Sequence, residues 1–331
     1  MAEREDPPRP YVFVTRELPG DAVERLRSAA EVEVWPGQEP PPREELLRRA
    51  ARADALLTLL TDRVDAALLD AAPRLRIVSN MAVGYDNIDV AAATARGVLV
   101  TNTPGVLTET TADLAFALLL ASARRVVEGD RLARSGGWPT WHPSFLLGHD
   151  VYGATLGIIG LGAIGSAVAR RARGFAMRLL YCGKRRQEEL GAELGARFVP
   201  LDTLLQESDF VTLHVPLTAE TRHLIGRREL GLMKPDAILI NTSRGGVVDQ
   251  RALCEALRSR GIAGAGLDVA EVEPVPAGDP LLELYNLTLT PHVGSASIAT
   301  RRRMADMASD AILAVLRGQK PANLVNPEAA V

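Results

Sequence analysis

Lysine, cysteine and aromatic residues are scarce in this chain of 331 residues. It has three lysines, two cysteines (Cys182 and Cys254) and 4% aromatic residues. So few cysteines exclude a disulfide framework and indicate a reducing compartment, so we expect a cytoplasmic protein. A net charge of −3 excludes a polybasic nucleic-acid surface as the main theme.

Long hydrophobic runs are also absent. No apolar stretch reaches the roughly 18–20 residues that a membrane span needs, and residues 1–10 contain no apolar region of a secretory signal. We interpret those first residues as a tail that precedes the first strand. The histidines His142, His149 and His223 have no carboxylate or cysteine at ligand spacing, so no metal site is predicted.

What the chain does have is a repeated alternation of short apolar runs and helical segments, long enough for two domains. Buried parallel strands with helices on both faces give this pattern, which indicates the α/β class with two open sheets. The strands predicted for the first sheet are 11–15, 31–35, 53–58, 76–80 and 97–101. Those predicted for the second are 155–159, 178–182, 209–215, 237–241, 263–269 and 287–290.

Between the two sets the pattern changes. One long helix is predicted from about Thr108 to Arg134, and an irregular Gly-, Pro- and Trp-rich segment follows at 135–153. We interpret that segment as a loop that carries binding or subunit contacts. A final helix over 297–317 could return to the first domain and make it discontinuous.

The stretch TLGIIGLGAIG, residues 155–165, places three glycines between a strand and a helix. Gly160 makes the tight turn, Gly162 lets the backbone approach a pyrophosphate, and Gly165 lets helix and strand pack closely. The first amides of the helix face the phosphates. In this context the G-x-G-x-x-G spacing predicts a dinucleotide site.

The end of the next strand bears on which dinucleotide binds. An acidic residue there would bind the ribose hydroxyls of NAD, but this strand ends at Tyr181-Cys182-Gly183 and continues with Lys184, Arg185 and Arg186. These cations favour the 2′-phosphate of NADP. The alternative is a solvated basic loop.

Three further stretches follow later strands and carry one Arg, one Glu and one His: NTSRGGVVD with Arg244, GLDVAEVEP with Glu273, and TPHVGSAS with His292. Strand carboxyl ends share one edge of a parallel sheet, where ligands bind. Arg244 would anchor a carboxylate and polarise a carbonyl, His292 would transfer a proton, and Glu273 would orient the imidazole. Spacing alone does not choose between Glu271 and Glu273, and each residue also has a structural explanation.

Together these motifs resemble the D-isomer-specific 2-hydroxyacid dehydrogenase family, and the branch they resemble most is that of glyoxylate/hydroxypyruvate reductases. The similarity covers nearly the whole chain and includes MAVGYDNID at 81–89 and NTPGVLTETTADLAFALLL at 102–120. It implies a Rossmann NAD(P)-binding domain over 103–290, inserted in a flavodoxin-like substrate domain over 1–102 and 291–331. It also implies a homodimer in which the segment 135–153 packs on the partner.

The resemblance implies a role for each matching residue. Arg244, Glu273 and His292 would be catalytic, and Val83, Gly84, Arg244 and Trp141 would bind the substrate. The residues expected at the cofactor are Thr111, Gly160, Leu161, Gly162, Ala163, Ile164, Gly165, Gly183, Lys184, Arg185, Thr242, Ser243, Asp268, His292 and Gly294. Trp141 could instead serve only in subunit packing.

The function expected from the resemblance is NADPH-dependent reduction of small 2-oxo acids such as glyoxylate and hydroxypyruvate, with NAD(H) also possible. Two alternatives remain open. The chain could be another D-2-hydroxyacid or phosphite dehydrogenase, or a dinucleotide-sensing protein of the corepressor type.

Overall fold

The computed structural model describes residues 9–330, so most of the expected N-terminal tail lies outside the described residues. The chain forms two compact units. The first takes the chain up to Leu107 and resumes at Ala296, and the second is the continuous segment Thr108–Ser295. The sequence had placed these boundaries a few residues earlier, after residues 102 and 290.

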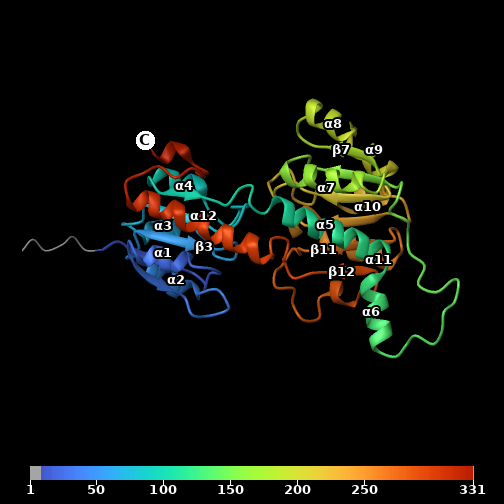
Figure 1. The fold of residues 1–331 in the computed structure, drawn as a ribbon, viewed down its shortest axis with the longest axis horizontal. Coiled ribbons are helices and arrows are strands. Elements are labelled where there is room, and N and C mark those ends of the chain that lie inside the picture. Colours follow the sequence, from blue (N-terminus) through green and yellow to red (C-terminus); the bar gives the residue numbers. More distant parts are fainter. Residues whose placement is uncertain (1–8, 331) are drawn as a thin grey trace, which may run out of the picture. The chain divides into compact units, whose positions relative to one another are not determined.

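The first unit contains a five-stranded parallel sheet (Figure 1). Its strand order is β2-β1-β3-β4-β5. Its strands are β1 (Tyr11–Val14), β2 (Glu31–Val34), β3 (Ala55–Thr58), β4 (Ile77–Asn80) and β5 (Leu99–Thr101). Its helices are α1 (Ala22–Arg27), α2 (Arg43–Ala50), α3 (Ala66–Asp70), α4 (Val90–Ala95) and α12 (Ile298–Leu316), with a 3₁₀ turn at Pro327–Ala330. Every predicted strand of this sheet is present.

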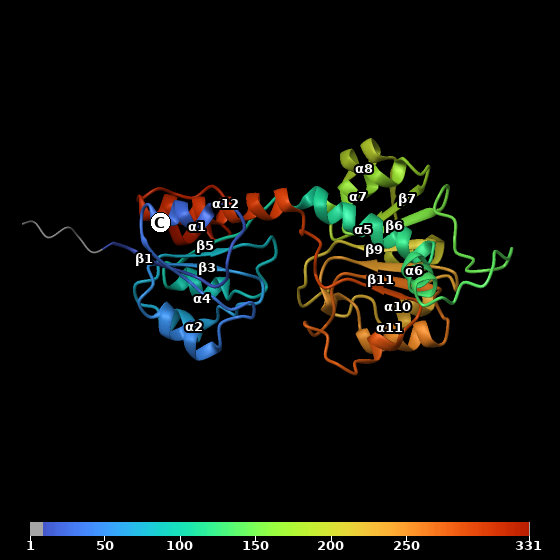
Figure 2. The same cartoon turned by 60° about the horizontal axis from the view of Figure 1, so that its bottom comes forward.

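Helices cover both faces of this sheet. α1 and α12 pack together on one face, and α2 and α4 lie on the other, as Figure 2 shows. Because β1 and β3 are buried on both faces, their sequences are almost continuously apolar. Asp65, Asp89 and Ser297 cap the first turns of α3, α4 and α12 through their side chains.

The second unit contains a seven-stranded parallel sheet in the order β12-β11-β10-β9-β6-β7-β8. Its strands are β6 (Thr155–Ile159), β7 (Arg178–Cys182), β8 (Ala196–Phe198), β9 (Phe210–Leu213), β10 (Ile238–Asn241), β11 (Gly264–Leu267) and β12 (Leu287–Leu289). Its helices are α5 (Thr108–Ala123), α6 (Val126–Arg134), α7 (Ala163–Arg173), α8 (Glu188–Leu194), α9 (Leu201–Glu207), α10 (Arg227–Leu232) and α11 (Gln250–Arg258), with 3₁₀ turns at Gly245–Val247 and Pro280–Glu283.

Two apolar cores lie on the two faces of this sheet. α5 and α7 enclose one with Leu156, Ile158 and Tyr181, and α9, α10 and α11 enclose the other with Leu213 and Leu239. Figure 2 shows α5 and α7 on one side and α10 and α11 on the other. The predicted α/β class with two parallel sheets is thereby confirmed.

The single helix predicted over 108–134 is wrong. Arg125 takes a left-handed conformation (φ 51°), which ends α5 before it and starts α6 after it. The Arg125 guanidinium then bonds to the Glu128 carboxylate at 2.6 and 2.8 Å, which stabilises the break. Nothing in residue type marks this point, because Arg is a good helix former.

The segment 135–153 that follows α6 has no helix or strand, as expected. Among residues 9–330, no helix has both the length and the apolar character required to span a bilayer.

Candidate active site

The glycine turn after β6 is shaped as the sequence predicts. Gly160 has φ 98°, and a Cβ there would lie 2.9 Å from the His214 backbone. A Cβ on Gly165 would lie 2.2 Å from the Gly160 carbonyl oxygen. A Cβ on Gly162 would meet no atom within 4 Å, so the backbone at Gly162 borders open space. The first and third glycines are therefore needed for packing, and the second lies where a ligand can approach.

A dinucleotide fits the surroundings of this turn. α7 starts at Ala163, and its N-cap residue Gly162 offers no side-chain acceptor to its first amides, which have no partner within the helix. The amides at Ala163 and Ile164 are thus able to donate to an anion such as a pyrophosphate. Thr242 follows β10, which is separated from β6 by one strand. Its hydroxyl is buried without a hydrogen-bond partner.

The basic loop after β7 is exposed at Gly183, Lys184 and Arg185. Arg186 forms an ion pair with Glu188 at 3.4 Å. Glu220, in the loop after β9, lies within electrostatic reach of Lys184, whose charge contributes to lowering the pKa of Glu220 after the larger effect of its hydrogen bond from Thr218. Lys184 and Arg185 are exposed cations at this loop, and Lys184 has the acidic Glu220 near it.

His292 and Glu273 are paired beyond the carboxyl ends of β11 and β12. The distance from His292 Nδ1 to Glu273 Oε2 is 2.6 Å, and Glu273 Oε1 accepts a 2.9 Å hydrogen bond from the Ala270 amide. Glu271 instead bonds to Nε2 of His223. The structure therefore separates two acids that the sequence alone could not.

Burial works to raise the pKa of the Glu273 carboxyl, but the hydrogen bond and charge of His292 outweigh it. The Ala270 amide and the Arg244 charge also lower the pKa, so it lies below the ordinary glutamate value. Glu273 is therefore an anion at neutral pH. Because it holds Nδ1 of His292, the other ring nitrogen, Nε2, is left to exchange a proton.

A buried carboxylate, Asp268, supports the turn that carries His292. Its oxygens accept hydrogen bonds from the Thr290 hydroxyl at 2.6 Å, the Val293 amide at 2.8 Å and the Gly294 amide at 2.7 Å. His292 itself has φ 55°, a left-handed conformation that costs a non-glycine residue energy. Asp268, which the sequence predicts at the cofactor, thus fixes the backbone of the turn that carries His292.

Arg244 lies on the turn between β10 and the 3₁₀ turn Gly245–Val247. The side-chain amide of Asn241 donates to the Arg244 carbonyl at 2.9 Å, and its oxygen accepts from Ser243 Oγ at 2.8 Å. A Cβ on Gly245 would lie 1.9 Å from the Ala270 carbonyl group. This close packing brings the Arg244 turn against the loop that carries Glu273.

Of the other predicted residues, Thr111 is buried on α5, with its side chain next to Gly294. Trp141 lies in the segment 135–153 and is 77% exposed. Val83 and Gly84 belong to the first unit, in the loop after β4. The structure thus gathers Thr111, Asp268, Glu273, His292 and Gly294 within the second unit, with Arg244 near Glu273.

His214, which follows β9 directly, is close to the glycine turn but has another role. Burial lowers its pKa to about 4, so the ring is neutral at pH 7, and Nε2 pairs with the Thr212 hydroxyl at 2.9 Å. This is a packed histidine at the end of a strand.

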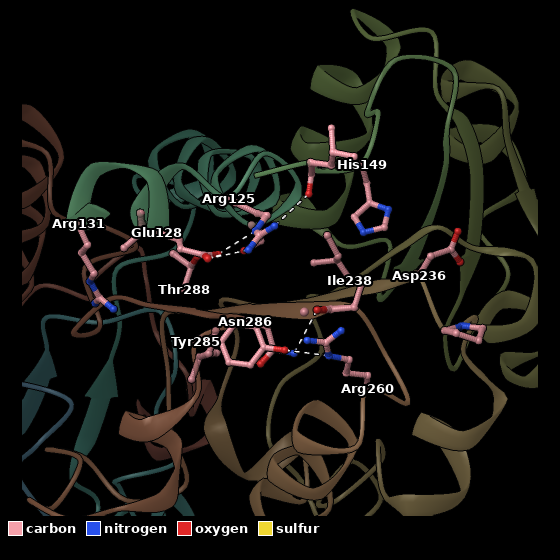
Figure 3. Close-up of a pocket in the computed structure, with 17 residues that line it drawn as sticks. Arg125, Glu128, Arg131, His149, Asp236, Ile238, Arg260, Tyr285, Asn286 and Thr288 are labelled. Carbon is pink, nitrogen blue, oxygen red and sulfur yellow. Dashed lines mark hydrogen bonds and ion pairs between the residues drawn. The ribbon is translucent and has the colours of Figure 1, made fainter. Parts of the chain in front are cut away.

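A cavity of about 600 Å³ lies at the opposite edge of the same sheet, where β10, β11 and β12 begin (Figure 3). Two of its arginines are already paired, Arg125 with Glu128 and Arg260 with Tyr285. It contains none of the predicted site residues. Over residues 9–330, no group of three His, Cys, Asp or Glu side chains could hold a metal ion.

The second unit has a parallel sheet with a glycine turn at a helix N-terminus. It also has an Arg, a Glu and a His after the carboxyl ends of later strands. Together these features define a dinucleotide-dependent α/β dehydrogenase. Residues 116–294 match the model of the D-isomer specific 2-hydroxyacid dehydrogenase NAD-binding domain. The chain belongs to the D-isomer-specific 2-hydroxyacid dehydrogenase family, as the sequence motifs predict.

Relatives cover nearly the whole length of the chain. A glyoxylate reductase of Korarchaeum cryptofilum is 58% identical over 97% of both chains. A solved structure from Thermus thermophilus is 51% identical, with a TM-score of 0.90 over 95% of this chain and 99% of that one. An NADPH-dependent glyoxylate/hydroxypyruvate reductase of Sinorhizobium meliloti, solved with NADP and malonate, is 35% identical, with a TM-score of 0.86 over 97% and 98%.

Proposed function

We propose that this chain reduces glyoxylate and hydroxypyruvate to the corresponding D-2-hydroxy acids, with NADPH preferred over NADH. The observation that carries the proposal is the 2.6 Å pair of His292 and Glu273 beside Arg244. It lies in the unit that carries the glycine turn. The 58% identity to a glyoxylate reductase supports the choice of substrate.

In the proposed mechanism the bound dinucleotide supplies a hydride. Arg244 and the amides of Val83 and Gly84 bind the substrate carboxylate, and Arg244 polarises the carbonyl to be reduced. His292 holds a proton at Nε2 and delivers it to the carbonyl oxygen. Glu273 keeps the imidazole oriented and stabilises its charged form.

The cofactor preference rests on the loop after β7. Position 183 is a glycine and not an acidic residue, which would repel a 2′-phosphate. The cations Lys184 and Arg185 that follow it are exposed. The Sinorhizobium meliloti relative is NADPH-dependent.

The test of the function is the initial rate of NADPH and NADH oxidation with glyoxylate, hydroxypyruvate, pyruvate or buffer alone. Fast turnover of the first two acids with NADPH well ahead supports both parts of the proposal. NADH ahead of NADPH contradicts the interpretation of Lys184 and Arg185 but leaves the reductase standing. Cofactor binding without turnover on any 2-oxo acid points to a sensor of the corepressor type.

We also infer a homodimer in which the segment 135–153 packs on the partner subunit. Trp141 would then reach the active site of that partner. Trp138, Trp141 and Leu147 are each more than 60% exposed, which is unusual for such large apolar side chains. Light scattering during gel filtration measures the mass directly. A monomer contradicts this inference.

Two buried free cysteines agree with a cytoplasmic location.

A further inference from the structure

The loop after β4 binds the substrate carboxylate in the proposed function, through the amides of Val83 and Gly84. An amide binds an anion only if its N–H points toward it. If a peptide in this loop rotated by half a turn, it would present a carbonyl oxygen and repel the carboxylate. The groups that fix the peptide planes of this loop therefore decide whether it binds an anion.

Two asparagine side chains fix the planes on either side of Gly84. Asn102 Nδ2 donates to the Val83 carbonyl at 2.8 Å, and Asn80 Nδ2 donates to the Gly84 carbonyl at 2.9 Å. The Val83–Gly84 peptide bond is trans, so its carbonyl and the N–H of Gly84 point in opposite directions. Because Asn102 holds the carbonyl, it directs the Gly84 N–H to the other side.

Asn102 is held in turn by the C-terminal segment of the chain. The side chain of Asn323 donates to the Asn102 carbonyl, and the Asn102 amide donates to the Asn323 carbonyl at 3.4 Å. The same segment pairs with the edge of β5 through the antiparallel bridge between Thr101 and Leu324. Asn102 is thus fixed from both sides within the first unit.

Fully buried Asn326 completes this attachment. Its side chain accepts from the Val100 amide at 2.7 Å and donates to the Val98 carbonyl at 2.9 Å. Buried hydrogen bonds of this kind are costly to lose. The segment after α12 is therefore part of the frame that supports the loop after β4.

We propose that Asn102 is a positioning residue that aims the Gly84 N–H at the substrate carboxylate, and that Asn323 supports it. This inference rests on the proposed function, because it assumes that Gly84 binds the carboxylate. It adds two residues that touch neither substrate nor cofactor but determine how well the anion is bound. The expected signature is weaker substrate binding with little change in the chemical step.

The test is Asn102→Ala in the full-length protein, with glyoxylate as the variable substrate and saturating NADPH. Loss of one directing hydrogen bond is expected to raise the KM for glyoxylate about tenfold, with kcat within about twofold. The Kd for NADPH, measured by fluorescence, stays at the wild-type value because the glycine turn belongs to the other unit.

The matched control is Asn286→Ala. Asn286 is also half-buried and donates to two backbone carbonyls, those of Leu257 and Ala263, both at 3.2 Å. Both variants are expected to lower Tm, and only Asn102→Ala is expected to raise KM. An Asn102→Ala protein with lowered Tm and wild-type KM overturns the proposal, since the residue would then be purely structural.

If Asn102→Ala does not fold, Asn323→Ala provides the second variant. It removes the donor to the Asn102 carbonyl and leaves the Asn102 side chain in place, so a smaller rise in KM, about threefold, is expected. An unchanged KM overturns the link from the C-terminal segment to Gly84. Turnover of glyoxylate by the wild-type protein tests the proposed function separately, so the two failures are distinguishable.

Discussion

At the scale of single residues, Arg244 is the side chain to which the proposed mechanism assigns both substrate binding and carbonyl polarisation. Its backbone is fixed by Asn241 through a 2.9 Å hydrogen bond, so replacing the side chain leaves the turn in place. Arg244→Gln is expected to lower kcat/KM for glyoxylate by about 10²–10³-fold, while the Kd for NADPH stays close to that of the wild type.

The control for that variant is Arg251→Gln. Arg251 lies on α11 with its side chain 86% exposed and contacts Glu255 at 3.8 Å, an interaction of little energetic value. Steady-state kinetics should show wild-type activity for it. If Arg244→Gln loses NADPH affinity as well as activity, the arginine has a structural role.

In the proposed mechanism Glu273 orients the ring that delivers the proton. Its carboxylate lies 2.6 Å from Nδ1 of His292, which leaves Nε2 to donate to the carbonyl oxygen. Glu273→Gln removes this anionic partner, so kcat for glyoxylate reduction is expected to fall by about 10²-fold, while the Kd for NADPH stays at the wild-type value. A wild-type kcat in steady-state kinetics would contradict the role assigned to Glu273.

The same variant has a distinct stability signature. The pKa of Glu273 is lowered in the folded protein, with burial opposed by the stronger influence of His292. A carboxyl with a lowered folded pKa stabilises the protein above its ordinary pKa of about 4.3, and the effect is lost as pH falls through the folded value. The Tm difference between wild type and Glu273→Gln should therefore shrink below about pH 4.

At the scale of elements, the contact of the Arg244 turn with the loop after β11 depends on the absence of a side chain at Gly245. A Cβ would lie 1.9 Å from the Ala270 carbonyl group. Gly245→Ala must push the two segments apart, which is expected to cost about 1–3 kcal/mol and to separate Arg244 from Glu273. Denaturant unfolding and kcat/KM should both show the loss.

Gly231→Ala is the matched substitution for Gly245→Ala. Gly231 lies within α10, and a Cβ there would meet no atom within 4 Å. Alanine in a helix is more favourable than glycine by about 1 kcal/mol, so a small gain in stability with unchanged activity is expected. Equal losses in both variants would show that the effect at Gly245 is not one of packing.

The elements also show what the sequence could and could not predict. Both sheets were predictable because strands buried on both faces are continuous apolar runs, and the glycine turn has fixed spacing. β8 was missed because it is a three-residue strand at the sheet edge, two of whose residues are exposed. The break at Arg125 was missed because it depends on a backbone conformation that Arg does not signal.

The site also has a part that the sequence predicts and a part that it does not. Arg244, Glu273 and His292 stand in recognisable motifs, and the structure shows Glu273 paired with His292. The supporting contacts of Asp268, Asn102 and Gly245 depend on segments that are far apart in the chain. Asn102, for example, bonds to Val83 and to Asn323, and no local pattern encodes such contacts.

At the scale of the whole molecule, the second unit is one continuous segment with its own two apolar cores, whereas the first unit is assembled from both ends of the chain. A segment with its own core folds independently in many proteins. We therefore expect residues 108–295, expressed alone, to fold and to bind NADPH, since the glycine turn, the basic loop and Thr242 all lie within it.

That fragment should bind the cofactor but not reduce glyoxylate. It keeps Arg244, Glu273 and His292 but lacks Val83 and Gly84, the proposed carboxylate donors. NADPH at 100 times its Kd should stabilise the fragment by about 2.7 kcal/mol, measured as a shift in its thermal unfolding. Turnover of glyoxylate at the wild-type rate would show that the first unit is dispensable, and would contradict the roles assigned to Gly84 and to Asn102, which orients it.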